Sequence, residues 1–263
     1  MVKLFPFRVG GVHVATDPCI TEKSSERICA PHGVHANRRL NLMRSSAICA
    51  GMSDAETVEL AALARTKCFD RRDHLFEQGQ PVRQIVLIES GSVKLTQLSH
   101  GGSEVILWLH GVGEAVGLTG SVSSSLHTCS ARAVLTTRVM MWDWFTLERG
   151  FPAAVKIRRN LGRILSERLG ELEERFREIA TERVSRRVAL ALLRIGKQIG
   201  QARNSDVEVF LSREELAQLT GTTLFTISRL MSKWSEMEIV IPRREAVVIL
   251  NVDLLAKISE EGE

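Results

Sequence analysis

The sequence lacks any apolar run long enough to cross a membrane, because such a span needs about 20 consecutive apolar residues. Its first residues, Met1–Val14, are interrupted by Lys3, Arg8 and His13, and are too short and too polar for a signal peptide. The excess of positive over negative charge is also small. The net charge of +4 permits contact with phosphates but does not require it. We therefore expect a cytoplasmic protein without a membrane partner.

Cysteine is sparse and widely spaced. The five cysteines lie far apart, at Cys19, Cys29, Cys49, Cys68 and Cys129. In the cytoplasm they would mostly be reduced thiols rather than disulfides. Loops that wrap an iron–sulfur cluster need short cysteine spacings, so these spacings argue against a cluster. We expect no metal site and interpret Cys68 and Cys129 as core residues of strands.

The length of 263 residues suits two modest domains better than one large one. Hydrophobic residues make up 44% and charged residues 25% of the chain, as in an ordinary globular protein. Residues 1–42 show neither helical nor strand periodicity and are expected to form a poorly ordered extension. Met43 directly precedes the first convincing element and is a candidate start of the native chain.

Residues 43–151 have the pattern of a mostly β domain. A short helix is predicted over Ser53–Ala64, where Ser53 and Glu56 form a capping box. Many short strands separated by glycine turns favour a β-roll or jelly roll. The predicted strands are Ile85–Ile88, Val93–Gln97, Val105–Leu109 and Ala131–Trp144.

Residues 152–182 form the most periodic segment of the chain. Pro152 suits the first turn of a helix that is predicted to run from Ala153 to about Thr181. Apolar residues at spacings of four and three form the seam of a coiled coil, which predicts a dimerisation helix. The seam residues are Leu165, Leu169, Leu172, Phe176 and Ile179. The alternative is a single helix that packs its stripe on its own domain.

Residues 183–263 carry the signals of a winged helix-turn-helix. After an amphipathic helix over Val184–Ile199, Ser212 and Glu215 form a capping box for a helix over Arg213–Leu219. Gly221 permits a left-handed turn between two helices, and Thr223 can cap the second one. Two short strands on either side of Arg243, Arg244 and Glu245 predict a wing with a basic tip.

The second helix of this motif has the composition of a DNA-reading helix. Leu224, Ile227, Leu230 and Met231 are predicted to pack on the first helix, while Phe225, Ser228, Arg229 and Ser232 project outward. Arg229 can make a bidentate contact with guanine, which is worth roughly 1–3 kcal/mol of discrimination. The residues placed for phosphate contacts are Thr222, Thr223, Thr226 and Lys233.

This order of parts resembles the Crp/Fnr superfamily of bacterial transcription regulators over residues 43–255, most specifically in Thr220–Arg229. The resemblance implies an α+β chain with a β-roll sensor domain, a long dimerisation helix and a C-terminal winged helix-turn-helix. It implies a homodimer that binds a palindromic double-stranded DNA site and contacts RNA polymerase. It also implies an effector sensed in the roll and relayed through a hinge near Thr181–Val184. We predict an activator, and repression is also compatible with this interpretation.

Two departures from the family pattern change the expected ligands. Phe225 stands where well-known members carry a Glu, so it is a candidate contact for a thymine methyl group. Members that bind cyclic AMP carry a Glu, an Arg-Ser pair and a Thr-Ser pair in the pocket. Aligned on Gly117, those positions hold Leu118, His127-Thr128 and Leu172-Glu173, with Cys129 beside them. Without the Arg, the fork-shaped contact to a phosphate is lost. The sequence therefore argues against cyclic AMP.

Three alternatives stay open beside this interpretation. One alternative is a haem- or redox-sensing regulator. His127 and Cys129 would face one side of a strand, so both are candidate haem ligands. Further candidates are His74, His100 and His110. The same pair could form a thiol nucleophile and base, but nothing orients the His, so we predict no enzyme. A signalling module with a degenerate DNA-binding domain is disfavoured by Ser228-Arg229 and the basic wing.

Overall fold

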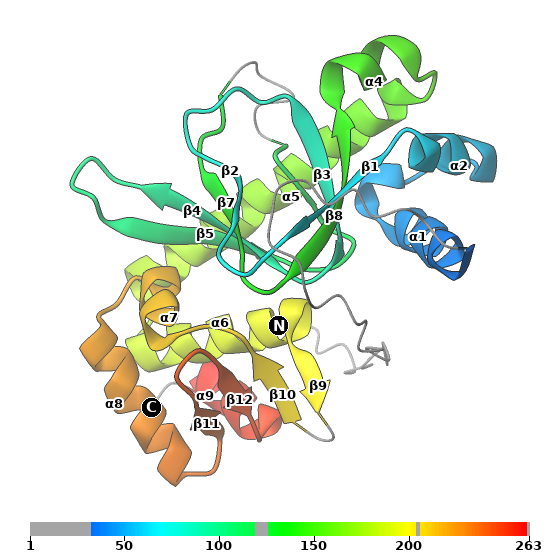
Figure 1. The fold of residues 1–263 in the computed structure, drawn as a ribbon. Helices are drawn as coiled ribbons and strands as arrows, with labels where there is room; N and C mark the ends of the chain where they lie inside the picture. Colours follow the sequence, from blue (N-terminus) through cyan, green and yellow to red (C-terminus); the bar gives the residue numbers. More distant parts are fainter. Residues whose placement is uncertain (1–32, 119–125, 204–205, 262–263) are drawn as a thin grey trace.

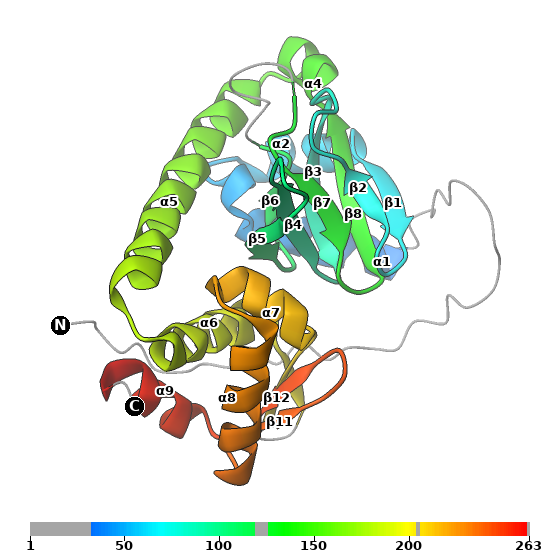
Figure 2. The same cartoon turned by 90° about the vertical axis from the view of Figure 1, so that its left-hand side faces the viewer.

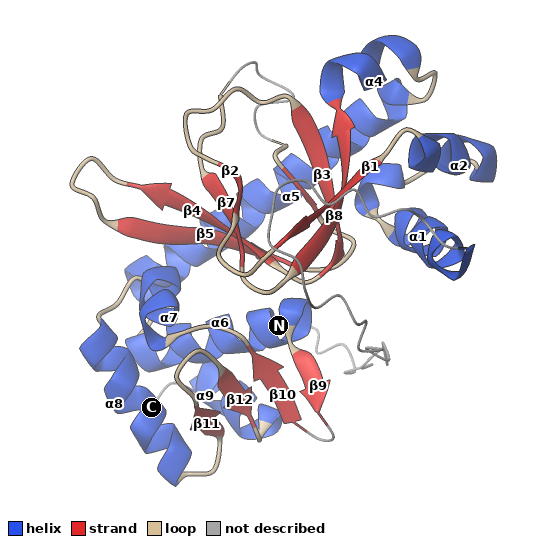
Figure 3. Cartoon of the chain, viewed as in Figure 1, coloured by secondary structure: helices blue, strands red, loops and turns tan. Residues whose placement is uncertain are grey.

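The computed structural model describes residues 33–118, 126–203 and 206–261. Two α+β domains are joined by one long helix (Figure 1). The N-terminal domain contains two four-stranded antiparallel sheets, and the C-terminal domain contains a third four-stranded sheet among helices (Figure 3). Among the described residues, no helix is long and apolar enough to span a membrane.

Three short helical segments precede the two sheets of the N-terminal domain. They are α1 (Gly33–Ser45), the 3-10 helix η1 (Ala47–Cys49) and α2 (Asp54–Ala62). The expected capping box at Ser53 and Glu56 is present on α2. The expected boundary at residue 43 is too late, because α1 starts at Gly33 and residues 33–42 are helical. This helix has little apolar periodicity, yet Met43 is fully buried and Leu42 packs against the same core.

The N-terminal domain, called the sensor domain after its expected role, is a β-roll of two facing sheets. One sheet has the order β1-β8-β3-β6 and the other β2-β7-β4-β5, with antiparallel neighbours throughout. The strands are β1 (Arg65–Phe69), β2 (His74–Phe76), β3 (Gln84–Ser90), β4 (Val93–Leu98), β5 (Glu104–His110), β6 (Ala115–Val116), β7 (Ser130–Ala133) and β8 (Thr137–Asp143).

The predicted strands at 85–88, 93–97 and 105–109 are confirmed within β3, β4 and β5. The predicted strand Ala131–Trp144 is wrong as one element. It is divided between β7 and β8, which lie in different sheets, and Trp144 starts α4 (Trp144–Gly150), which is capped by Asp143. The strands β1 and β2 were not predicted because their polar residues hide the alternation of exposed and buried positions.

Helix α5 (Ala154–Thr181) connects the two domains and runs along one side of the roll (Figure 2). It ends at Thr181, and α6 (Val184–Ile199) begins three residues later, so the chain breaks its helix where the sequence predicted. The first half of α5 is part of the sensor core. Ile157, Leu161 and Ile164 are at most 8% exposed there.

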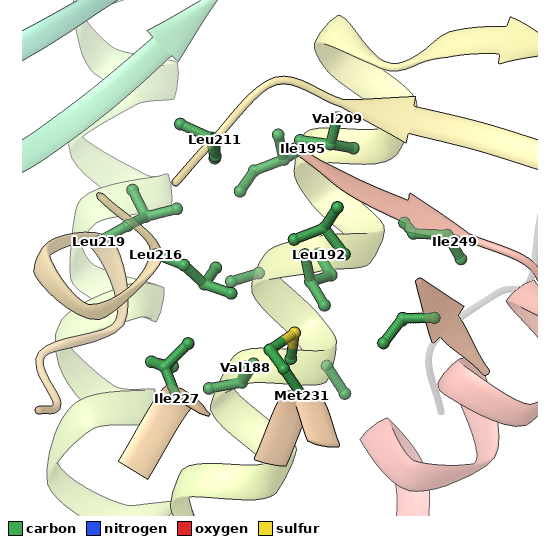
Figure 4. Packing of buried hydrophobic residues seen from close by; sticks show 14 of the residues in the cluster. Val188, Leu192, Ile195, Val209, Leu211, Leu216, Leu219, Ile227, Met231 and Ile249 are labelled. Carbon is green, nitrogen blue, oxygen red and sulfur yellow. The ribbon is translucent and has the colours of Figure 1, made fainter. Parts of the chain in front are cut away.

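The C-terminal domain is built around α6. Its buried face, including Val188, Leu192 and Ile195, forms the centre of an apolar core (Figure 4). The sheet order is β11-β12-β10-β9. The remaining elements are β9 (Gln201–Arg203), β10 (Asp206–Val209), α7 (Arg213–Thr220), α8 (Leu224–Glu236), β11 (Val240–Pro242), β12 (Val247–Ile249) and α9 (Val252–Glu261).

Candidate DNA-binding surface and effector cavity

The turn between α7 and α8 has the geometry that the sequence predicted. Ser212 and Glu215 form the complete capping box of α7. Gly221 caps the end of that helix in the left-handed conformation, with φ 60°, which a residue with a Cβ adopts only with strain. The Thr223 hydroxyl then accepts a hydrogen bond from the Thr226 amide and caps α8. These local contacts set the angle between the two helices.

Helix α8 presents a polar surface away from the core. Phe225 is 77% exposed, Arg229 is exposed and Ser228 is partly exposed. The phosphate candidates Thr223 and Lys233 are exposed, and Thr222 and Thr226 are partly exposed. On the opposite face, Ile227, Leu230, Met231 and Trp234 are buried. The prediction that Leu224 packs in this core is wrong, because Leu224 lies in the first turn of α8 and is 50% exposed.

The wing brings its basic residues next to the sensor domain. Arg243 pairs with the buried Glu208 of β10 at 2.5 Å, and Arg244 is exposed. Glu245 pairs with Arg71 and Arg72, which lie in the turn between β1 and β2. These side chains line an open cleft of about 740 Å³ between the wing and the roll. The wing is therefore held to the sensor domain by ion pairs.

A second contact joins the domains at the start of α7. Lys94 of β4 donates a hydrogen bond to Glu215 at 2.6 Å, and the Lys94 side chain is only 9% exposed. Burial alone would raise the pKa of Glu215, but hydrogen bonds from Lys94 and from the Ser212 amide outweigh it and leave that pKa below its usual value. The capping carboxylate of the helix-turn-helix is thus also a partner of the sensor domain.

A smaller cavity of about 170 Å³ lies between the roll and α5. Most of its surface is apolar, and the polar groups are contributed by few side chains. Its lining includes Phe76, Leu95, Leu107, Trp108, Gly117, Leu118, Thr128 and Cys129 from the roll, and Leu165, Arg168, Leu169 and Leu172 from α5.

The structure brings most of the predicted effector residues together at this cavity. Gly117, Leu118, Thr128, Cys129 and Leu172 line it, but Glu173 is exposed and does not. Glu173 is adjacent to Leu172 in the helix, so it points about 100° away around the axis. His127 lies next to the lining, with its ring stacked on Phe76 at a centroid distance of 3.7 Å.

Close packing around Gly117 explains the position of His127. Gly117 has φ 79°, and a Cβ there would lie 3.2 Å from the Gln84 carbonyl oxygen and 3.6 Å from the His127 ring. Burial lowers the pKa of His127, whose Nδ1 has no hydrogen-bond partner among the described residues. The ring is therefore a neutral packing group beside the cavity at pH 7.

Sequence reasoning missed Arg168, which carries the positive charge of this cavity. Its Nη2 donates a hydrogen bond to the Ala115 carbonyl at 2.6 Å. Burial lowers the pKa of the guanidinium, while Glu114, Glu171 and Cys129 act in the opposite direction. A local sequence pattern could not single it out, because it is one of many charged residues along α5.

The described residues do not fit a haem. The cavity is smaller than the roughly 300–1,000 Å³ of ordinary ligand pockets. His110 is 1% exposed and lies beside Glu114, away from the cavity lining, while His74 accepts a hydrogen bond from Arg132. Within the described ranges, no group of three His, Cys, Asp or Glu side chains could hold a metal ion. Cys19 and Cys29 lie outside the described residues.

The predicted dimer seam divides into a covered and an uncovered part. Leu165 is half-buried against the sensor core of its own chain. The next seam residues, Leu169, Leu172 and Phe176, are 57%, 39% and 73% exposed, and Ile179 is 45% exposed. An apolar stripe on the second half of α5 therefore stays largely exposed within the described part of the chain.

The same part of α5 also contacts the helix-turn-helix. Arg175 donates hydrogen bonds to the carbonyls of Ile106 and Leu219, at 3.3 and 3.2 Å, and lies over the Trp108 ring. Glu178, almost fully buried, forms a two-pronged ion pair with Arg194 of α6 at 2.5 and 2.8 Å. Arg175 thus connects a wall of the cavity with the end of α7.

Comparison with known families accounts for both domains. Residues 66–149 match the model of the cyclic nucleotide-binding domain, and residues 186–258 match that of the Crp-like helix-turn-helix domain. The chain belongs to the Crp/Fnr family of DNA-binding transcription regulators. In members of this family the cyclic nucleotide-binding domain is the effector domain.

Curated relatives and solved structures agree with this assignment. The chain is 26% identical to the transcriptional activator protein Anr of Pseudomonas protegens, over 71% of this chain and 77% of the relative. It is 28% identical to the cyclic AMP receptor protein of Thermus thermophilus, over 75% and 89%. The global regulator CLP of Xanthomonas campestris has the same fold, with a TM-score of 0.65, 22% identity and coverage of 76% and 100%.

Proposed function

We propose that the chain works as a cytoplasmic homodimer that binds a palindromic DNA site and regulates transcription in response to a ligand other than cyclic AMP. The exposed apolar stripe of Leu169, Leu172 and Phe176 carries this proposal. Pairing two such stripes in a coiled coil would bury them and give the assembly a two-fold axis. The two copies of α8 would then enter successive major grooves about 34 Å apart.

In this complex Arg229 reads guanine, and the hydroxyls of Thr222, Thr223 and Thr226, with Lys233, hold phosphates. Arg243 and Arg244 of the wing add further phosphate contacts. Phe225, the most exposed apolar side chain of α8, meets a thymine methyl group. Contact with RNA polymerase, as the activator Anr suggests, completes the role.

Control by the effector uses the connection between cavity and helix-turn-helix. A ligand beside Trp108 displaces the ring on which Arg175 lies, and Arg175 holds the Leu219 carbonyl at the end of α7. The break between Thr181 and Val184 lets the DNA-binding domain change its pose. In the new pose the wing leaves Arg71 and Arg72 and becomes available to DNA.

The test is selection of binding sites from random duplexes, followed by titration of the selected site at several salt concentrations. A palindrome with guanine in each half, and a log affinity that falls linearly with log salt, is the expected result. A non-palindromic consensus would contradict the dimer. If the protein binds no DNA fragment, either with or without metabolites from a cell extract, the proposed regulation of transcription is contradicted.

A further inference from the structure

We propose that the cavity between the roll and α5 takes a small carboxylic acid with an apolar, single-ring body, and that Arg168 binds its carboxylate. The proposal deepens the proposed function, because it names the class of effector for the site on which that function depends. It is independent of the mode of DNA recognition.

The chemistry of the cavity wall indicates an apolar ligand body. Leucine and aromatic side chains approach it from the β2-β7-β4-β5 sheet, from Leu118 after β6, and from α5. A volume of about 170 Å³ is below the usual range of ligand pockets, which starts at roughly 300 Å³. One ring with a short substituent suits this space, whereas a nucleotide exceeds it.

Arg168 supplies the reason for a negative charge. A guanidinium has five N–H donors in a planar fork, yet within the described part of the chain Arg168 donates only to the Ala115 carbonyl and forms no ion pair. Glu114 and Glu171 favour the charged form of Arg168, but among the described residues neither carboxylate lies within ion-pair distance of it. A charged, half-buried fork at an apolar cavity matches the two oxygens of a carboxylate.

The neighbouring polar groups do not favour a cation or a neutral polar ligand. Burial raises the pKa of the Cys129 thiol, so this side chain is uncharged at pH 7. Burial likewise keeps His127 neutral and packed on Phe76. Arg168 is therefore the charged side chain of the lining, and it lies on α5 rather than on the roll.

This placement also explains how a ligand would act on the dimer. Arg168 is followed at once by Leu169, the first exposed member of the apolar stripe, and both Leu169 and Leu172 also line the cavity. A carboxylate that draws Arg168 from Ala115 therefore moves the part of α5 that we assign to dimerisation. Ligand binding and subunit packing share the same turn of helix.

The experiment uses phenylacetate as the probe, with phenylacetamide as its neutral isostere and cyclic AMP as a third compound. Binding to the full-length protein is followed by calorimetry and by the fluorescence of Trp108, with Trp108→Phe identifying that signal. We expect phenylacetate to bind with a dissociation constant at or below about 1 mM, as fragment-sized ligands do, and the amide to bind roughly tenfold more weakly or worse.

Arg168→Met should abolish the preference for the acid, and Arg168→Lys should retain part of it. Arg163→Met is the matched control, because Arg163 is an exposed residue of the same helix paired only loosely with Glu167 at 3.9 Å. Thermal melts verify that all variants fold. Equal binding of acid and amide, unchanged binding by Arg168→Met, preference for cyclic AMP, or no binding of either ring compound would each overturn the proposal.

The same protein samples separate this proposal from the proposed function. If the wild-type chain is a dimer that shifts its selected DNA but binds no acid, the ligand assignment alone fails. If it is a monomer or shifts no DNA while phenylacetate still binds through Arg168, the proposed function fails and the ligand assignment stands.

Discussion

The two halves of α5 present their apolar side chains to different surroundings. In the first half, Leu161 is fully buried and Ile157 is 1% exposed, both against the sensor core of the same chain. In the second half, Leu169 is 57% and Phe176 73% exposed. One continuous helix therefore contributes first to the fold of a single chain and then to an exposed apolar surface, which we propose another copy covers. Changes in the two halves should separate folding from assembly.

The largest effect is expected in the first half. Leu161→Ala removes a fully buried side chain and leaves a cavity, so the free energy of unfolding should fall by about 2–5 kcal/mol. Urea denaturation followed by circular dichroism measures it. Val155→Ala, at a position that is 78% exposed on the same helix, should stay within about 0.5 kcal/mol of wild type. A loss for Leu161→Ala as small as that expected for Val155→Ala would mean that the first half is not part of the sensor core.

Arg229→Ala, with a smaller loss expected at each half-site, tests whether dimerisation through the second half of α5 lets two copies of α8 read one DNA site. Loss of a bidentate guanine contact should weaken binding by about 1–3 kcal/mol per half-site. In the dimer on a full palindrome the loss should be twice that of a monomeric variant on one half-site. Fluorescence anisotropy with both DNA lengths measures this ratio. A ratio near one would show that only one α8 reads DNA, and unchanged base preference would contradict the role of Arg229.

The smallest effect concerns the wing and the turn that holds it. Glu245→Gln removes the carboxylate that pairs with Arg71 and Arg72, so the effector-free protein should bind its site more tightly. Each exposed ion pair contributes about 0–1 kcal/mol, which limits the gain in affinity to roughly fivefold for each of the two pairs. The double variant Arg71→Gln, Arg72→Gln is the control, because it breaks the same contact without changing the charge of the wing. Unchanged or weaker binding by that control would contradict the contact's role.

The helix-turn-helix could be predicted from sequence because its determinants are local. Ser212, Glu215, Gly221 and Thr223 lie within twelve positions of one another in the chain, and each acts on its own turn or cap. The helix over 184–199 was predicted for a similar reason, since its apolar face repeats within one segment. The error at Leu224 arose because helical periodicity predicted burial for the first residue of α8, which is half exposed.

The effector cavity could be predicted only in part. Its roll residues followed from the family resemblance, but Arg168 reaches it because of where α5 crosses the roll, which no spacing along α5 reveals. The helix α1 was missed for a related reason. Its polar residues hide the two positions, Leu42 and Met43, through which it joins the core. Contacts between distant segments decide both cases.

The most direct test of the account is the mass of the full-length protein in solution, measured by sedimentation equilibrium for the wild type and for Phe176→Glu. We predict about twice the chain mass of 29.3 kDa for the wild type and the single mass for the variant, with unchanged circular dichroism. Glu167→Gln, an exposed polar change on the same helix, should remain dimeric. A monomeric wild type, or a variant that stays dimeric, would contradict the assignment of the second half of α5 to subunit pairing.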